Sequence, residues 1–253
     1  MWIWEALLNL LFPRTPQCPL CGSPGTEGVC EVCRQVLAVF RRRGVCVRCG
    51  RYPERGEAPP GALCPTCRKV SWPFVAARGA GPFESLLRKT IHRFKYGGRR
   101  SLAPVLGELM AEAAREESLF RAAEVCVPVP LTPARLNARG FNQAELLARE
   151  VGRRLGLEVV GALARIRETP PQTGLTRGGR AANIEGALVP LSNHGVRGRR
   201  VLLIDDVFTT GATAAASARA LLRGGALEVY VLTAATVAQR GVYARPNFDA
   251  GSH

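Results

Sequence analysis

The chain has 253 residues, of which 47% are hydrophobic and 22% charged, a balance that supports a packed core and excludes global disorder. Its length allows one or two domains, and no apolar run reaches the roughly 18–20 residues of a membrane-spanning helix. Lysine and arginine outnumber acidic residues 35 to 20, and +11 of the net charge of +15 lies in the first 100 residues. This basicity points to an anionic partner and says nothing about the fold.

The chain begins with MWIWEALLNLLF, which is apolar nearly all round and ends at Pro13. It lacks the basic start and the small-residue cleavage site of a signal peptide. We therefore predict a short apolar helix within residues 1–15, and such a helix must be covered. Cover by the same chain is the simplest interpretation, and a partner protein or a membrane surface is the alternative. The sequence predicts a cytoplasmic protein, which the membrane alternative would place at the inner face of the membrane.

Eight of the nine cysteines form four C-x-x-C pairs, the spacing at which two thiolates on one tight turn bind the same zinc ion. We predict two structural zinc ions in a double zinc-ribbon module that spans residues 16–72. A disulfide framework would also have an even number of cysteines and is the alternative. Sequential pairing is the simplest, and interleaved pairing stays open. The sequential ligand sets are Cys18, Cys21, Cys30 and Cys33, then Cys46, Cys49, Cys64 and Cys67.

The zinc module stays basic even after each four-thiolate zinc centre contributes its charge of about −2. Many of its arginines lie close together in the sequence, shortly before and after the third cysteine pair. They form either a solvated face of a small module or a surface that binds the phosphates of DNA. The candidates for DNA contacts are Arg41, Arg42, Arg43, Arg48 and Arg51.

Beyond the cysteines, helical and strand patterns alternate. We predict helices over residues 83–96, 101–118, 141–155 and 213–223, and buried strands over residues 124–130, 200–204 and 228–233. Strands that alternate with helices predict a parallel α/β sheet, so residues 73–250 form the second domain. On the first of these helices we expect His92 and Lys95 to line a basic face, and an approach to the ligand cleft is the alternative. Cys126 lies inside a predicted strand and is expected in the core.

Residues 201–213, VLLIDDVFTTGAT, carry the pattern with the most chemical content. An apolar strand leads to Asp205 and Asp206, and a turn rich in threonine and glycine then opens a helix. Ligands bind at the carboxyl ends of strands in open α/β sheets, and a helix N-terminus is a phosphate site. Two carboxylates beside a phosphate suit the hydroxyl groups of a ribose or a Mg²⁺-bridged ribose. The segment therefore predicts a site for a 5-phosphoribosyl group.

This segment resembles the motif with which type I phosphoribosyltransferases bind 5-phosphoribosyl 1-pyrophosphate (PRPP). The resemblance implies that Asp205 and Asp206 hold the ribose hydroxyls and that magnesium accompanies the pyrophosphate. It also implies a cradle for the 5′-phosphate formed by Thr209, Thr210, Gly211, Ala212 and Thr213.

Two further segments suit the same ligand. The loop after the first strand of this domain would face the pyrophosphate, which suits guanidinium groups; a basic turn with a helix start is the alternative. Its candidates are Arg135, Arg139, Gly140 and Asn142. Residues 167–183 resemble the mobile loop that closes over PRPP, with a plain surface loop as the alternative. Its candidates are Arg167, Gln172, Arg180 and Asn183.

Nearly the whole chain resembles the ComF family of competence proteins, of the ComFC type. Besides the cysteine pairs and the PRPP motif, the matching segments are IHRFKYGGR (91–99), VPVPLTPARLNARGFNQA (127–144) and QTGLTRGGRAAN (172–183). The resemblance implies an N-terminal zinc-ribbon module followed by a type I phosphoribosyltransferase-like domain. It also implies a role in handling or importing single-stranded DNA during natural transformation.

Two alternatives to a DNA-handling role stay open. The chain is either an active phosphoribosyltransferase whose acceptor the sequence does not identify, or a non-catalytic adaptor for the competence helicase. A glutamine-dependent amidophosphoribosyltransferase is excluded, because it needs a cysteine directly after the first methionine and this chain has Trp2 there.

Overall fold

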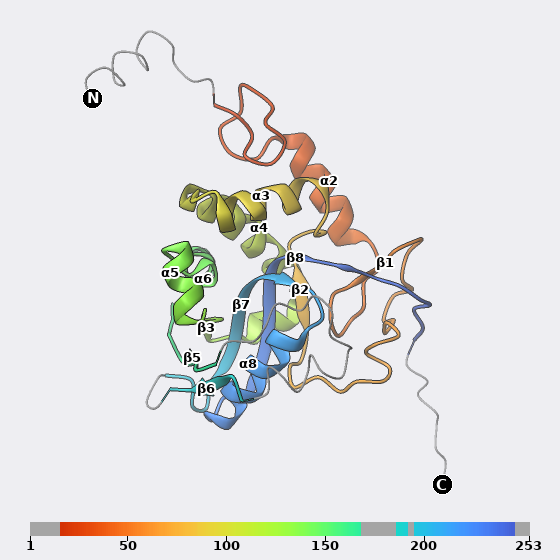
Figure 1. Cartoon of the computed structure of the whole chain (residues 1–253). Coiled ribbons are helices and arrows are strands. Elements are labelled where there is room, and N and C mark those ends of the chain that lie inside the picture. Colours follow the sequence, from red (N-terminus) through yellow and green to blue (C-terminus); the bar gives the residue numbers. More distant parts are fainter. Residues whose placement is uncertain (1–15, 168–185, 192–194, 246–253) are drawn as a thin grey trace, which may run out of the picture.

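A five-stranded parallel sheet lies at the centre of the computed structural model, which describes residues 16–167, 186–191 and 195–245 (Figure 1). The strands, in their order across the sheet, are β2 (Ala77–Gly79), β8 (Glu228–Thr236), β7 (Arg200–Phe208), β3 (Val125–Pro128) and β4 (Glu158–Val159). Every neighbouring pair is parallel. The predicted parallel α/β domain is therefore confirmed.

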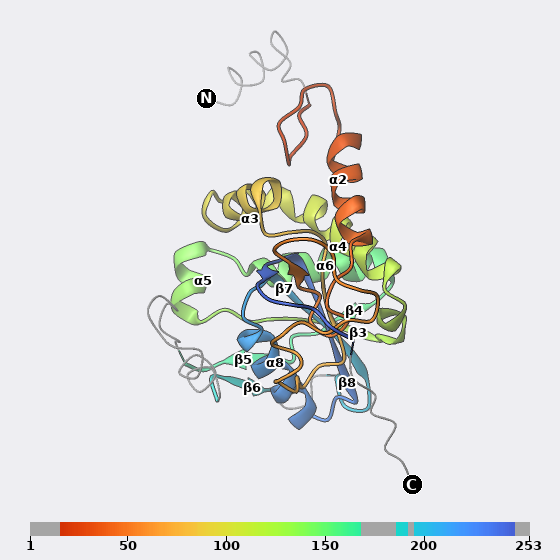
Figure 2. The same cartoon turned by 90° about the vertical axis from the view of Figure 1, so that its right-hand side faces the viewer.

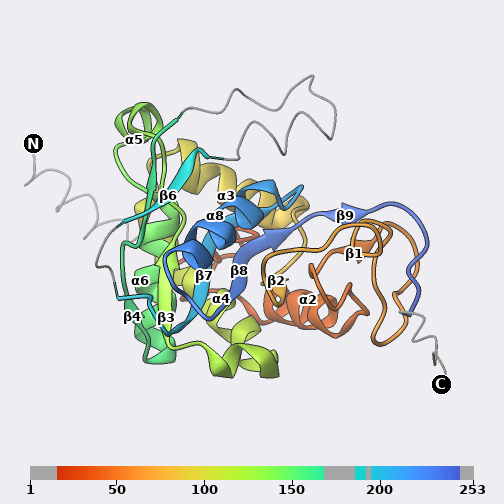
Figure 3. The ribbon, with the colours of Figure 1, turned by 90° about the horizontal axis from the view of Figure 1, so that it is seen from below.

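Helices cover both faces of this sheet because successive strand residues point to opposite sides. Leu202 and Ile204 of β7 share one apolar core with α3, α4 and α6, whereas Val201 and Leu203 share the other with α8. The helices are α3 (Ser85–Tyr96), α4 (Ala103–Glu116), α6 (Gln143–Leu155) and α8 (Ala212–Arg223). Seen from below in Figure 3, α4 and α8 lie on opposite sides of β7 and β8.

The strand expected to end at residue 204 continues to Phe208. It does so because β8 is long enough to pair with it as far as Thr236. Asp205 and Asp206 consequently lie inside the strand rather than after it. Thr209 then begins the turn into α8.

The loop predicted after β3 contains a short helix, α5 (Pro133–Arg139). Thr132 caps it by accepting a hydrogen bond from the Arg135 amide, and Pro133 stands in the first turn, where its missing N–H costs nothing. Gly140 ends it with a φ of 71°, the left-handed conformation that favours glycine. Part of the predicted loop is therefore helical, and α5 carries Arg135 and Arg139.

The zinc-ribbon module packs into the second domain instead of standing apart. Its helix α2 (Glu31–Arg42) rises beside α4 in Figure 2, and Arg34 bridges the two helices with an ion pair of 2.6 Å to Glu112. Its short strand β1 (Tyr52–Pro53) pairs in parallel with β9 (Ala238–Gln239) near the end of the described chain. Cysteines of both ribbons belong to the same apolar cores as the sheet.

Three smaller pieces complete the described chain. β5 (Leu163–Arg165) pairs with β6 (Leu188–Pro190) in antiparallel fashion, and two 3₁₀ turns cover Arg100–Leu102 and Ser118–Ala122. The apolar helix predicted within residues 1–15 lies outside the described residues. Within the described ranges, no helix has the length and apolar character to cross a membrane.

Candidate functional site

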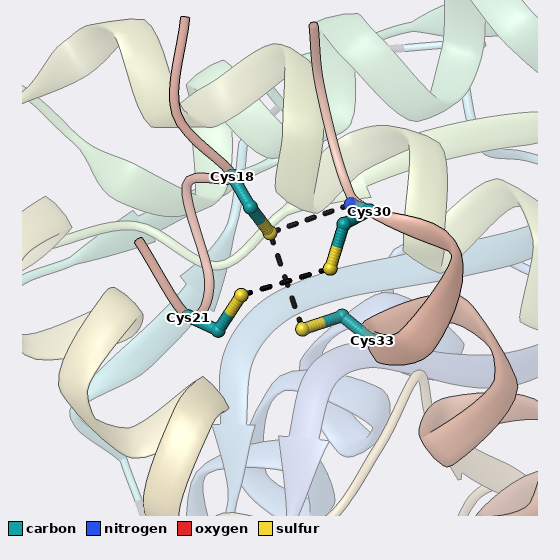
Figure 4. Close-up of side chains that lie close together, drawn as sticks. All are labelled: Cys18, Cys21, Cys30 and Cys33. Atoms are coloured by element: carbon teal, nitrogen blue, oxygen red, sulfur yellow. Dashed lines mark hydrogen bonds between the residues drawn. The ribbon is translucent and has the colours of Figure 1, made fainter. Parts of the chain in front are cut away.

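The first four cysteines meet at one point, as Figure 4 shows. The Sγ atoms of Cys18 and Cys33 are 3.9 Å apart and those of Cys21 and Cys30 are 3.6 Å apart. Four sulfurs at about 2.3 Å from a zinc ion in tetrahedral geometry lie about 3.8 Å from one another, so the cluster fits zinc. Cys30 and Cys33 lie at the start of α2, a helix that the sequence analysis missed.

The second set of cysteines forms an equivalent cluster, with 3.6 Å between the Sγ atoms of Cys49 and Cys64. Backbone amides of Cys64 and Cys67 donate to sulfurs of the cluster, and the Trp72 indole donates to the Cys67 Sγ over 3.1 Å. Such donors stabilise thiolates, the form that binds metal. Sequential pairing is thereby confirmed, and the chain has two four-cysteine zinc-ribbon sites.

Most of the predicted ligand residues of the second domain line one cleft of about 230 Å³ at the carboxyl ends of β3 and β7. The cleft joins four stretches of the chain: Lys95 of α3, residues 129–144, Arg165 of β5 and residues 205–213. Its polar lining residues are Lys95, Arg135, Arg139, Asn142, Gln143, Arg165, Asp205, Asp206, Thr209 and Thr213. We call residues 209–213 the phosphate loop. Thr209 and Thr213 of this loop line the cleft with the two acids and the arginines of α5, whereas Thr210 and Ala212 line the neighbouring hollow beside Arg51 and Trp72.

The acid pair lines the cleft and is partly neutralised. The Lys95 Nζ is 2.7 Å from the Asp206 Oδ1, and both side chains are largely buried. Burial, followed by repulsion from Asp206, raises the pKa of Asp205 to about 7. The Asp206 N–H, Lys95 and Arg165 act in the opposite direction. The pair therefore carries less negative charge than two free carboxylates, which suits a phosphorylated ligand.

The phosphate loop turns at Gly211, which has a φ of +85° and caps the start of α8. A Cβ atom there would lie 2.9 Å from the rings of both Phe208 and Trp72, so only glycine fits. The Thr210 hydroxyl accepts a hydrogen bond from the Ala212 amide. The loop thus presents the start of an α-helix to the cleft, the arrangement that favours phosphate binding.

Arg51 braces the phosphate loop from behind. Its guanidinium donates two hydrogen bonds to the Thr209 carbonyl oxygen, at 3.0 Å from Nε and 2.6 Å from Nη2, and one to the Gln239 Oε1 at 3.0 Å. It also lies 5.2 Å from the centre of the Phe208 ring. Arg51 is 3% exposed, and it stands just after Cys49 of the second zinc centre, separated from it by one glycine.

Trp72 provides a second link between that zinc centre and the loop. Its indole N–H donates to Cys67, and the far edge of its ring occupies the space beside Gly211. Its carbonyl oxygen accepts a hydrogen bond from Arg48 at 3.1 Å. The second zinc ribbon and the phosphate loop therefore form one connected unit.

The two arginines on α5 line the cleft, while Asn142 and Gly140 form the connection between α5 and α6. Arg139 donates to the Gln143 Oε1 and to the Tyr96 hydroxyl at the rim. The Asn142 amide donates to the Val129 carbonyl oxygen and its Oδ1 caps α6. Gly140 supplies the left-handed turn between α5 and α6.

Four residues were assigned to a mobile loop in the sequence analysis. Arg167 is exposed just after β5, and Gln172, Arg180 and Asn183 lie outside the described residues. Their predicted role stays a prediction.

The five arginines that the sequence analysis assigned to DNA do not share one open surface. The Arg41 side chain is 10% exposed and pairs with Glu112 and Glu116 of α4. Arg51 is buried behind the phosphate loop. The other three are Arg42 and Arg43, which are exposed, and Arg48, which is half-buried. DNA contacts by Arg41 and Arg51 would require them to leave these intramolecular partners.

Two cleft residues, Gln143 and Arg165, were missed in the sequence analysis, and a third, Lys95, was given the cleft only as the alternative. Lys95 was expected on a basic face, but the structure directs it into the cleft against Asp206. Gln143 is 1% exposed and holds Arg139, and Arg165 enters from β5. Lys95 stands inside IHRFKYGGR, the segment that carried the family resemblance, so a signal for it was present. Arg165 lay in a stretch without any distinguishing pattern.

The two halves of the chain match two known domain families. Residues 7–68 match the double zinc ribbon domain, and residues 139–249 match the phosphoribosyl transferase domain. Together with the two cysteine clusters and the parallel sheet, they define a double zinc ribbon fused to a phosphoribosyltransferase-like domain.

Relatives that match this chain over most of their own length identify the family within this class of proteins. The DNA utilization protein YhgH of Salmonella typhimurium is 31% identical over 224 residues, which cover 85% of this chain and 94% of the relative. Competence protein F of Haemophilus influenzae is 30% identical over 81% of this chain and 89% of its own length. Competence protein ComFC of Bacillus subtilis is 27% identical over 79% of this chain and 80% of its own length. The chain belongs to the ComF family of competence proteins.

Proposed function

We propose that the cleft binds PRPP together with Mg²⁺. The observation that carries the proposal is the meeting of the acid pair, the phosphate loop and the arginines of α5 in one cleft. Asp205 and Asp206 would accept hydrogen bonds from the ribose hydroxyls, and the phosphate loop would hold the 5′-phosphate. Arg135 and Arg139 would face the pyrophosphate, since guanidinium groups match its oxygens.

The acidic and hydroxyl groups present fit a magnesium ion that arrives with its ligand. Mg²⁺ prefers oxygen ligands and is usually bound through a few carboxylates and the phosphates of a substrate. It would neutralise pyrophosphate charge. Lys95 already balances Asp206, so this chain supplies part of the positive charge by itself.

The family supports a biological role in handling DNA. The relatives carry the names DNA utilization protein and competence protein. We propose that this chain likewise handles single-stranded DNA during natural transformation, with PRPP as a ligand of its cleft. An active phosphoribosyltransferase and a helicase adaptor remain the competing hypotheses.

Calorimetric titration with PRPP and Mg²⁺ tests the cleft. We expect the wild-type chain to bind and the variant with both Asp205→Asn and Asp206→Asn to lose binding. These isosteric changes leave the fold intact, because asparagine at position 205 keeps the side-chain oxygen that accepts the hydrogen bond from the backbone N–H of residue 206. The matched control is Glu145→Gln with Glu158→Gln, two surface acids outside the acid pair. Equal PRPP affinity in the double variant and the control would contradict the assignment.

A pyrophosphate-release assay separates the competing hypotheses. The protein is incubated with PRPP, Mg²⁺ and a series of nucleobases or amines. Release that depends on one acceptor identifies an enzyme. Binding without release, together with single-strand binding, supports the DNA-handling role.

A further inference from the structure

Helix α3 has a basic surface. The acidic residue at its N-cap, Glu84, accepts a hydrogen bond from the Tyr52 hydroxyl. The helix Ser85–Tyr96 contains four arginines and lysines, one histidine and no acidic residue. Arg88, Lys89 and His92 are exposed, and within the described chain neither Arg88 nor Lys89 has an ion pair. In contrast, Arg41 in the zinc module is held by two glutamates. Lys95, in the last turn of α3, is paired with Asp206, so the charge that remains without an ion pair in the described chain is that of Arg88 and Lys89.

The exposed side chains of α3 follow one line along the helix. Residues 85, 88, 89, 92 and 96 are spaced by three or four positions, so they share one face. Tyr96 is 63% exposed, and its ring centroid lies 4.9 Å from that of His92. Exposed rings beside basic groups are the combination that binds single strands, because bases stack on the rings while phosphates meet the charges.

This line begins at the first zinc centre. Arg88, Lys89, His92 and Arg93 line a hollow of about 670 Å³ together with residues 20–22 of the first knuckle. Arg93 and Thr90 both donate to the Pro19 carbonyl oxygen, which fixes the knuckle against α3. Figure 1 shows α3 between the first ribbon and α5.

The line ends at the cleft. Lys95, in the last turn of α3, reaches Asp206, and Tyr96 accepts a hydrogen bond from Arg139, whose guanidinium lies 5.0 Å from the Tyr96 ring centre. Arg139 lines the cleft as well. One basic and aromatic face therefore runs from the first zinc centre to the proposed PRPP site.

We propose that single-stranded DNA lies along this α3 face, with phosphates at Arg88 and Lys89 and a base on Tyr96. The 12 residues of α3 span about 18 Å, enough for about five stacked nucleotides at a rise of about 3.4 Å each. This inference rests on the proposed DNA-handling function and assigns the surface that binds the strand. It also replaces segment 41–51, where Arg41 and Arg51 are engaged inside the protein.

Fluorescence anisotropy with a labelled oligothymidylate of about ten nucleotides, within the usual site size of single-strand binders, tests the surface in the full-length, zinc-loaded protein. Arg88→Ala with Lys89→Ala removes two phosphate contacts, so the slope of log K against log salt should become shallower by about 1.4. The control, Arg121→Ala with Arg223→Ala, removes the same charge from exposed positions on the 3₁₀ turn at 118–122 and at the end of α8. It should leave the slope nearly unchanged.

The aromatic contact has its own pair of variants. Tyr96→Ala should weaken binding by at least about fivefold, because stacking is worth roughly 1–3 kcal/mol per base. Tyr96→Phe keeps the ring and loses only the hydroxyl that accepts from Arg139, so it should bind like the wild type. Equal loss in both variants would refute a stacking role.

The outcomes separate this inference from the proposal on which it rests. A wild-type protein that binds no single strand at low salt removes the DNA-handling function. A wild type that binds, with the Arg88/Lys89 variant equal to its control, overturns the α3 surface alone. Tighter binding of a duplex, or much tighter binding of oligouridylate, would also overturn the assignment to single-stranded DNA. PRPP titration of the Arg88/Lys89 variant should match the wild type.

Discussion

Replacing Arg51 with methionine removes the group that braces the phosphate loop while it keeps the apolar stem. The variant loses three hydrogen bonds, two to the Thr209 carbonyl oxygen and one to Gln239, and the contact with the Phe208 ring. A hydrogen bond from a charged donor contributes about 1.5–3 kcal/mol, and the cost of burying the guanidinium offsets part of the sum. We expect a loss of about 2–3 kcal/mol in the free energy of unfolding.

The effect on the ligand follows from the loop itself. Thr209 belongs to the proposed phosphate cradle, and without its brace the loop must be ordered when PRPP binds. Fixing the backbone of one residue costs about 1–2 kcal/mol, which corresponds to an affinity about 5- to 30-fold lower. Calorimetry measures this affinity. Amide hydrogen exchange of the phosphate loop in the ligand-free protein should also become faster, and this second measurement does not depend on any ligand.

Arg41→Met supplies the matched control. Arg41 is also a largely buried arginine of the zinc module, but its partners are Glu112 and Glu116, far from the cleft in the fold. This variant should lose stability and retain PRPP affinity. The reasoning is refuted if Arg51→Met keeps wild-type affinity and exchange rates, or if both variants lose affinity equally, which would indicate a general loss of structure.

Three further predictions concern single groups of the site. Burial raises the pKa of Asp205 from 3.8 to about 7. The contribution of Asp205 to stability is therefore complete below about pH 4 and is lost as the pH rises through 7. Asp205→Asn should raise Tm relative to the wild type, and the increase should be larger at pH 8 than at pH 5. Lys95→Met removes a positive charge beside the acid pair. The attraction between this charge and a ligand phosphate roughly 10 Å away is worth about 1–2 kcal/mol, so PRPP affinity should fall about tenfold. Metal analysis should find two zinc ions per chain; Cys49→Ser and Cys21→Ser should each lose one, and only Cys49→Ser should directly disturb the phosphate loop.

The sequence could predict the parts of the site that depend on neighbouring residues in the chain. The four cysteine pairs and the run from Asp205 to Thr213 are local patterns, and each pattern specifies its own chemistry. Lys95 and Arg51 were misassigned because their partners, Asp206 and Thr209, lie more than 100 residues away. The sequence alone does not distinguish a basic residue that faces solvent from one that contacts DNA or one that supports a loop from within the protein.

The same limit explains the errors in the elements. β7 extends to Phe208 because β8 pairs with it, and no pattern within residues 200–208 predicts that pairing. Helix α2 was missed because four cysteines dominated the interpretation of its surroundings, although Cys33, Leu37 and Phe40 form an apolar stripe at helical spacing.

The two zinc centres hold different parts of the cleft lining. The first centre fixes α3 through the Pro19 carbonyl oxygen, and α3 carries Lys95 to the acid pair. In the second centre, the knuckle that ends at Cys49 leads directly to Arg51, which fixes the phosphate loop at Thr209. Because metal binding energy is folding energy in such modules, zinc stabilises both parts of the lining at once. The zinc ribbons are therefore structural parts of the proposed ligand site, which gives a physical reason for finding the two domains packed together in one chain.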